Sequence, residues 1–315
     1  MQQRTTRSAP NQENLQGKSC ARVSPPLTRS RAFGKDITNQ HSHSRPATSS
    51  DPQLLSYYAR EIFDFLYASE LAHTAGYGYM KRQTDITEKM RAILVDWLVD
   101  VHLKFKLMPE TLFLTVNVLD RVLERQPVVR VKLQLVGVVA LLVASKYEEI
   151  YAPEVRDLVH ITDSTFSKEE ILEMEAQILH TLDFNLTTAS AFRFLERFSR
   201  LAEASTRTET LAQYLLELSL VEYKMLKYRG SLVAAAALYL ACKLEQRECL
   251  WTSVLVEQTH YTEAEVRPCA RDLCVLMQGA EKATLTAVRK KFSLPRFLEV
   301  ALISPLQALT PSFKS

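Results

Sequence analysis

The chain has 315 residues, enough for one large or two ordinary domains, and its net charge of +3 is unevenly divided. Residues 1–50 carry a net charge of +6, which leaves about −3 for residues 51–315. A folded region with this charge is not a basic nucleic-acid binder. The longest apolar runs, Leu135–Ala144 and Leu232–Cys242, have 10 and 11 residues, too few to cross a membrane, so we expect buried helices there.

The five cysteines form an odd, scattered set without a CxxC pair: Cys20, Cys242, Cys249, Cys269 and Cys274. That pattern indicates reduced thiols rather than a disulfide framework or a zinc site. No apolar segment follows the first charged residues, so no secretory signal is expected. We expect a protein of the nucleus and cytoplasm.

Residues 1–50 are rich in Gln, Ser, Thr, Arg, Pro and Asn and poor in large apolar residues, which predicts a disordered basic tail. From Tyr57 onward the pattern is helical almost throughout, and only seven glycines occur in the chain. The expected fold class is all-α. Helices are predicted at residues 53–73, 86–107, 109–124, 130–149, 153–160, 167–182, 188–204, 207–226, 231–246, 251–259, 262–279 and 281–291.

The second of these helices contains the stretch MRAILVDWLVDVHLKF, Met90–Phe105, which is apolar on two faces. One arc holds Met90, Ile93, Leu94, Trp97, Val101 and Phe105, and the opposite arc holds Ala92, Val95, Val99 and Leu103. Such a helix is either sandwiched inside a core or buries one face and offers the other to a partner. The stretch by itself favours the sandwich.

Two Ala-rich helices repeat each other along the chain. Val136–Glu149 and Val233–Gln246 are identical at 6 of 14 positions at an offset of 97 residues. Small residues allow neighbouring helices to approach closely, so each run is predicted to be the central helix of its own bundle. The chain is therefore expected to form two similar helical domains joined near Asp183–Thr188.

No pattern of catalytic residues is found in the sequence. The chain has no GxSxG, HExxH or P-loop motif, and its seven histidines are dispersed. We therefore expect no enzyme, no cofactor and no metal site. Three charged residues within apolar helices need partners or a place at a rim, because unpaired burial is costly. A structural ion pair suits Arg91 and Asp120, whereas a binding role suits Lys146 at the end of its helix.

Four stretches of the sequence closely resemble the cyclins, and the similarity continues in order to about Phe292. They are YAREIFDFL, MRAILVDWLVDVH, KLQLVGVVALLVASKYEEIYAPEV and ITDSTFSKEEILEMEAQIL. The resemblance is greatest to the B-type, mitotic cyclins, and an A-type cyclin acting in S and G2 phases is the alternative. It implies two tandem five-helix folds, with an N-terminal helix and first fold in residues 51–186, a second fold in 187–292 and a C-terminal tail in 293–315.

The resemblance implies a regulatory subunit that binds a cyclin-dependent kinase, holds its mobile C-helix inward and recruits substrates at the G2-to-mitosis transition. Catalysis then belongs to the partner. Two other classes remain as rivals, a transcription-associated cyclin-fold protein and a helical enzyme. The first would need a basic face, and the second would need an inward-facing set of acid, base or metal-binding residues.

The resemblance also assigns site residues. Lys146 and Glu175 match a charged pair that contacts the kinase, and Arg91 and Asp120 match an internal ion pair. The apolar surface beside the first pair is matched by Val143, Tyr147, Leu179, Phe184 and Leu186. A patch that docks Arg-x-Leu substrates or inhibitors is matched by Met90, Ile93, Leu94, Trp97, Asp100, Leu133 and Gln134, which reverses the preference for a sandwich. Asp100 stands where the family often has Glu.

The tail contains two segments that resemble degrons incompletely. RAFGKDITN, Arg31–Asn39, is similar to a destruction box but lacks the Leu expected three residues after the Arg. QEN, Gln12–Asn14, lacks the Lys of a KEN degron. Each segment is either a signal read by the ubiquitin-ligase machinery or plain linker. Neither a nucleic acid nor a membrane is expected as a partner.

Overall fold

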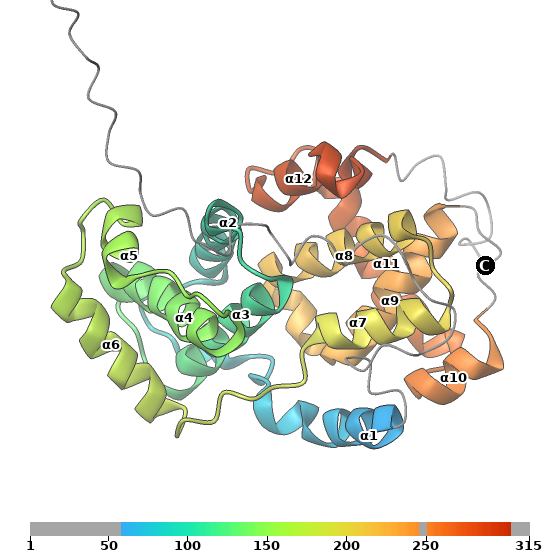
Figure 1. Cartoon of the computed structure of the whole chain (residues 1–315), viewed down its shortest axis with the longest axis horizontal. Helices are drawn as coiled ribbons and strands as arrows, with labels where there is room; N and C mark the ends of the chain where they lie inside the picture. Colours follow the sequence, from blue (N-terminus) through green and yellow to red (C-terminus); the bar gives the residue numbers. More distant parts are fainter. Residues whose placement is uncertain (1–57, 246–250, 304–315) are drawn as a thin grey trace, which may run out of the picture. The chain divides into compact units, whose positions relative to one another are not determined.

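The computed structural model describes residues 58–245 and 251–303 (Figure 1). In these ranges the secondary structure consists of α-helices and short 3-10 helices without a strand, so the all-α prediction is confirmed. All described residues belong to one compact unit. No described helix has the length and apolar character required to cross a membrane.

The first five-helix fold surrounds α4 (Leu133–Glu148). Helices α2 (Glu88–Phe105), α3 (Pro109–Arg125) and α6 (Lys168–Thr181) pack against it, and α5 (Val155–Ile161) packs on α6. Every residue of α4 from Leu135 to Ser145 is buried. The long apolar run of the sequence is therefore the centre of this bundle, because such a helix has no polar face to offer to water.

The second five-helix fold surrounds α9 (Gly230–Leu244) in the same way. Helices α7 (Ala191–Leu201), α8 (Thr206–Val221) and α11 (Glu263–Gly279) pack against α9, and α10 (Ser253–Thr259) contacts α7 and α9. A capping box starts α11, with Thr262 and Glu265 capping each other's backbone N–H groups. Two tandem five-helix folds are thus confirmed.

The N-terminal helix α1 (Ala59–Ser69) and the 3-10 helix η4 (Glu70–His73) attach to the second fold through Tyr67 and Glu70. The Tyr67 hydroxyl donates to the carbonyls of Gln258 and Thr259 at 3.2 and 3.1 Å. The buried Glu70 carboxylate accepts hydrogen bonds from the N–H and the hydroxyl of Ser231, at 2.7 and 2.8 Å, and so caps the start of α9. The first residues of the helix expected at 53–73 lie outside the described ranges.

The helix expected at 281–291 is wrong in its start, because α12 spans only Ala287–Phe292. The Asp96 carboxylate of α2 accepts a hydrogen bond from the Ala287 N–H at 2.9 Å, which fixes the start of α12 from another element. The remaining elements are 3-10 helices: η5 (Tyr79–Arg82), η6 (Arg130–Lys132), η7 (Tyr223–Lys227), η8 (Pro295–Phe297) and η9 (Val300–Leu302).

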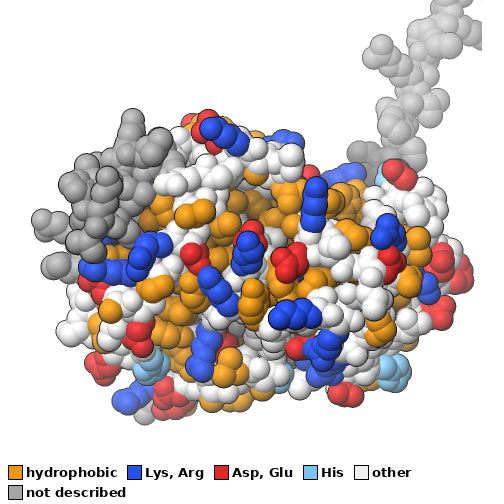
Figure 2. Space-filling view, turned by 180° about the vertical axis from the view of Figure 1, so that it is seen from behind, with side chains coloured by type: hydrophobic (Ala, Val, Ile, Leu, Met, Phe, Trp, Pro, Cys, Tyr) orange, Lys and Arg blue, Asp and Glu red, His pale blue; other side chains and the backbone are white. Residues whose placement is uncertain are grey.

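Figure 2 shows the face opposite to that of Figure 1. On this face Lys and Arg side chains are interspersed with Asp and Glu side chains, and hydrophobic side chains lie between them. Scattered apolar side chains of this kind are normal on a folded protein. Binding surfaces therefore have to be found from the exposure of particular residues.

Candidate functional site

Arg91 and Asp120 form a buried ion pair between α2 and α3, with 1% and 3% of their side chains exposed. The Asp120 carboxylate accepts from Arg91 Nε at 2.6 Å, from Arg91 Nη2 at 2.7 Å and from the Tyr79 hydroxyl at 2.7 Å. Burial by itself would lower the pKa of Arg91, but the charge and hydrogen bonds of Asp120 outweigh it and raise the pKa.

This pair also joins the two folds. Arg91 Nη1 donates to the carbonyl of Leu220 in α8 at 2.9 Å, so one guanidinium contacts α2, α3 and α8. With both charges compensated and out of solvent, the pair is part of the interior and offers nothing to a partner.

Lys146 and Glu175 form a second ion pair, at the surface where α4 ends beside α6. Lys146 Nζ lies 2.6 and 2.8 Å from the two carboxylate oxygens of Glu175. The lysine side chain is 49% exposed and the glutamate 13%. Both are held in place by regular helices, yet Lys146 keeps donor capacity toward solvent, since an ammonium group has three N–H bonds.

Exposed apolar residues lie near this pair. Tyr147 is 49% exposed and Phe184 61%, while Leu179 and Leu186 are partly buried against the first core. The Tyr147 hydroxyl is 2.6 Å from Thr187 Oγ1, which ties the end of α4 to the segment that leads to α7. Phe184 follows α6 in the left-handed region, with φ of 57°, and its ring contacts His180.

One residue assigned to this surface does not lie on it. Val143 is only 3% exposed and belongs to the core of the first fold. It lies one turn before Lys146 on a helix whose middle is entirely buried, and the switch from core to surface falls between Ser145 and Lys146. Val143 therefore supports Lys146 and Tyr147 from below.

Two exposed apolar residues were missed by the assignment. Ile150 is 88% exposed and Tyr151 59%, in the segment between α4 and α5. The signal in the sequence was a pair of large apolar residues next to Ala152 and Pro153, outside any helical period. We name Lys146, Tyr147, Ile150, Tyr151, Glu175 and Phe184 the α4–α6 surface.

The second candidate surface lies on α2 and the start of α4. Ile93 is 49% exposed, Met90, Trp97 and Gln134 are partly buried, and Asp100 is exposed. We name these five residues the α2 patch. Its apolar part is a narrow strip with a carboxylate at one end.

The expectation that Leu94 and Leu133 are exposed is wrong, since they are 6% and 5% exposed. Leu94 packs on α4 at Gly137, where an added Cβ would come within 2.7 Å of Leu94 Cδ1. These two leucines form the floor of the α2 patch. The opposite arc of α2 is buried too, with Val95 in the core of the first fold and Val99 in that of the second. Helix α2 is therefore sandwiched between two cores and has one exposed edge, at Ile93.

No cluster of three or more His, Cys, Asp or Glu side chains suited to a metal ion is found in residues 58–245 and 251–303. The segments Gln12–Asn14 and Arg31–Asn39 lie outside the described residues.

The sequence matches two family models in succession, "Cyclin, N-terminal domain" over residues 61–187 and "Cyclin, C-terminal domain" over residues 189–306. Together they cover the helices of both five-helix folds. The fold and the matched domains define a protein with tandem cyclin folds. The chain belongs to the cyclin family.

Similar curated proteins are B-type cyclins. The chain is 42% identical to a G2/mitotic-specific cyclin-B of Dictyostelium discoideum, over 85% of this chain and 62% of that protein. It is 46% identical to Cyclin-B2-1 of Oryza sativa subsp. japonica, over 84% of this chain and 63% of the relative. The chain is 43% identical to a G2/mitotic-specific cyclin-B of Marthasterias glacialis, over 82% of this chain and 67% of that protein. The chain thus spans less than two thirds of the length of the first two.

Solved structures share the fold at low identity. A viral cyclin from herpesvirus saimiri has a TM-score of 0.63 at 20% identity, over 68% of this chain and 96% of that one. A chain of the yeast RNA Pol II CTD kinase CTDK-1 complex has a TM-score of 0.55 at 14% identity, over 74% of this chain and 88% of that one. Both likenesses concern the arrangement of helices.

Proposed function

We propose that this chain is a non-catalytic regulatory subunit that binds and activates a cyclin-dependent protein kinase at the G2-to-mitosis transition and recruits its substrates. Membership of the cyclin family supports the partner class, and the names of the relatives at 42–46% identity support the mitotic role. The observation that carries the proposal is the α4–α6 surface, where a half-exposed ion pair lies near exposed aromatic side chains.

The α4–α6 surface has the composition of a protein interface. Tyr147, Tyr151 and Phe184 are large, rigid side chains of the type that dominates binding energy, and Ile150 adds an aliphatic side chain in the same segment. Lys146 precedes Tyr147 in α4 and has its charge compensated by Glu175, so a partner can cover it at a smaller desolvation cost. The kinase would contribute the acceptor for the remaining N–H of Lys146.

The α2 patch is the proposed docking site for Arg-x-Leu segments of substrates or inhibitors. The strip of Met90, Ile93 and Trp97 suits the leucine, and exposed Asp100 suits the arginine. An Asp side chain is one methylene shorter than Glu, so the arginine has to approach α2 more closely than at a patch that carries Glu.

The basic tail would carry the signals that end the protein's life, read by ubiquitin-ligase machinery at Arg31–Asn39 or Gln12–Asn14. The same proposal places the protein in nucleus and cytoplasm, where a kinase and its mitotic substrates meet. Both statements depend on the sequence alone.

Co-expression of the full chain with a cyclin-dependent kinase tests the proposal directly. The kinase should co-purify with the chain, and its activity on a short peptide should rise by orders of magnitude over that of the kinase alone. A double variant, Tyr147→Ala with Phe184→Ala, should lose both effects and keep its helical circular dichroism. A kinase that neither co-purifies nor gains activity would refute the proposed function.

A further inference from the structure

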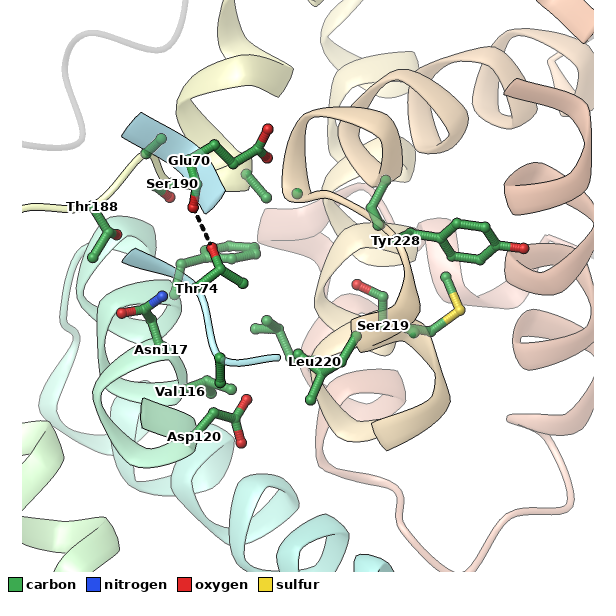
Figure 3. A pocket seen from close by; sticks show the side chains of 18 of the residues that line it. Glu70, Thr74, Val116, Asn117, Asp120, Thr188, Ser190, Ser219, Leu220 and Tyr228 are labelled. Carbon is green, nitrogen blue, oxygen red and sulfur yellow. Dashed lines mark hydrogen bonds between the residues drawn. The ribbon is translucent and has the colours of Figure 1, made fainter. Parts of the chain in front are cut away.

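A cavity of about 110 Å³ lies where the two five-helix folds meet (Figure 3). Its walls come from Arg91 of α2, from α3, from η4 and the residues after it, from residues 188–191, from the end of α8 with η7, and from the start of α9. None of the residues of the α4–α6 surface or the α2 patch lines it. The proposed function leaves this cavity unexplained.

The lining has an apolar part and a polar part. The apolar part includes Phe113, Val116, Leu220, Met225 and Val233. The polar part is made of the amide of Asn117 and the hydroxyls of Thr188, Ser190 and Ser219. Figure 3 shows Asn117 and Thr188 on one side of the cavity and Ser219 with Leu220 on the other, while the ring of Tyr228 points away from its centre.

Three of these polar groups keep hydrogen-bonding capacity. Asn117 Nδ2 donates to the carbonyl of His73 at 2.8 Å, which uses one of its two N–H bonds. Ser190 Oγ accepts from the Phe192 N–H at 3.3 Å, which leaves its own proton. Ser219 Oγ donates to the carbonyl of Leu216 at 2.6 Å, which leaves its lone pairs. The wall therefore has both donors and acceptors to offer.

The charged groups of the lining are already compensated. Asp120 pairs with Arg91, and the Glu70 carboxylate accepts two hydrogen bonds from Ser231. Burial raises the pKa of Glu70, as expected where a charged group is removed from water. Because Arg91, Asp120 and Glu70 already have partners, an anion or a cation would lose its hydration in the cavity without gaining an uncompensated charge. The cavity selects for a neutral ligand.

The volume of about 110 Å³ limits the ligand further, to a molecule of a few heavy atoms. We propose that this cavity is a binding site for a small neutral molecule with a short branched aliphatic body and an amide or hydroxyl head group. The aliphatic body packs on Val116 and Leu220, and the head group bonds to Asn117, Thr188 and Ser190.

Four nearly isosteric probes test the selection on the full chain: isobutyramide, isobutanol, isobutyrate and isobutylammonium. Saturation-transfer NMR should detect the first two, and isobutyrate and isobutylammonium should bind at least tenfold more weakly. Equal binding of charged and neutral probes would overturn the proposal. So would the absence of isobutyramide binding at the highest concentration that leaves the protein folded.

Two variants locate the binding to this cavity. Ser219→Leu fills the cavity and should abolish isobutyramide binding. Thr188→Val keeps the side-chain shape but removes the hydroxyl, and should weaken binding several-fold, as loss of one hydrogen bond does. Thr187→Val is the matched control, because that neighbouring threonine does not line the cavity, and it should bind like the unaltered chain.

If Ser219→Leu does not fold, the comparison of Thr188→Val with Thr187→Val decides the question. Isobutyramide binding that is equal in these two variants would place the ligand elsewhere and refute the site. Because these measurements need no kinase, their failure is separate from a failure of the proposed function.

Discussion

Lys146 is half exposed, whereas its partner Glu175 is nearly buried, so the two halves of this ion pair respond differently to mutation. Removal of the lysine leaves the fold with one uncompensated carboxylate near the surface, where water still reaches it. The effect on folding should be small. The effect on a partner that covers the pair should be much larger, because water is then excluded.

We therefore expect Lys146→Ala to raise the Kd for the kinase more than tenfold and to change the melting temperature little. Titration calorimetry and thermal unfolding measure the two quantities. Lys168→Ala is the matched control, since this exposed lysine is the first residue of α6 and has no ion pair with Glu175. Wild-type affinity of a folded Lys146→Ala protein would contradict the assignment of this surface.

Ile93 and Leu94 are neighbours on α2 with opposite environments, which makes them a matched pair. Leu94→Ala should cost about 2–5 kcal/mol of unfolding free energy, because it leaves a cavity against α4. Ile93→Ala should cost far less and should raise KM for a substrate with Arg-x-Leu while kcat stays constant, because uniform binding energy is lost.

Kinase assays on substrates with and without the Arg-x-Leu motif give KM and kcat for each variant, and urea unfolding gives its free energy of unfolding. An equal loss of activity by Ile93→Ala on both substrates would show that the α2 patch does not recruit substrate.

At the scale of elements, the connection between α2 and α3 depends on a buried histidine. His102 is 3% exposed, and its Nε2 lies 2.8 Å from the carbonyl of Met108, to which the neutral ring donates. Burial, together with the charge of Lys291, lowers the pKa of His102 to about 3. The ring is therefore neutral in the folded protein at neutral pH.

The pH dependence of stability follows from this shift. Between the ordinary pKa of about 6.5 and about 3, the unfolded chain binds a proton at His102 that the folded chain does not. Stability from this residue is complete above pH 6.5 and falls as the pH decreases, by up to about 1.4 kcal/mol per pH unit. His102→Gln keeps a donor for Met108 and does not titrate.

Urea unfolding of the unaltered chain and of His102→Gln from pH 7 to 4 measures how steeply the free energy of unfolding of each protein changes with pH. Burial raises the pKa of Glu70, Glu110 and Asp96, and these groups act in the opposite direction, but they are common to both proteins. Parallel stability curves for the two proteins would rule out the neutral buried His102.

The attachment of α12 depends on an ion pair that is almost completely buried. Lys291 Nζ lies 2.7 Å from both carboxylate oxygens of Glu217 in α8, and the two side chains are 2% and 0% exposed. Lys291→Met should cost about 3–5 kcal/mol, because it leaves Glu217 charged in the interior. The double variant with Glu217→Leu should recover most of that loss.

Unfolding free energies of the two single variants and the double variant close a mutant cycle for this pair. If the double variant is as unstable as the two losses added together, the Lys291–Glu217 bond does not hold α12 as we describe.

At the scale of the whole molecule, the tail should control the lifetime of the protein, and the folded region should activate the kinase. Deletion of residues 1–50 should leave kinase activation unchanged, because both proposed surfaces lie within residues 90–184. It should also lengthen the life of the protein after mitosis. In the full chain, Arg31→Ala should have the same effect on lifetime and Arg45→Ala should not, as a cycloheximide chase can measure. Identical decay of all forms would exclude a degron in the tail.

The prediction of the fold from sequence succeeded where a local signal decided the structure. Ala-rich apolar runs became α4 and α9, and the Ser167 and Thr262 capping boxes start α6 and α11 at the expected residues. It failed at α12, where Asp96, almost 200 residues away along the chain, fixes the helix start. A contact with such a separation leaves no mark in the local pattern.

For the candidate site too, some features were predicted before the structure and others were not. The residue pattern pointed to Lys146, because a lysine at the end of an apolar helix is visible in a sequence, whereas Glu175, Ile93 and Trp97 were assigned only through the resemblance to the cyclins. Burial of Leu94, Leu133 and Val143 was not visible, because periodicity gives the arc on which a residue lies but not what covers that arc.

The sequence by itself determined the all-α class, the two repeated bundles and the cyclin family, since these depend on composition, periodicity and the order of motifs. Only the tertiary structure decided that α2 lies between two cores, that Glu70 caps α9, and that a cavity remains where the folds meet. The physical reason is that burial and cavities belong to pairs of elements, and which elements face each other is fixed only when the chain packs.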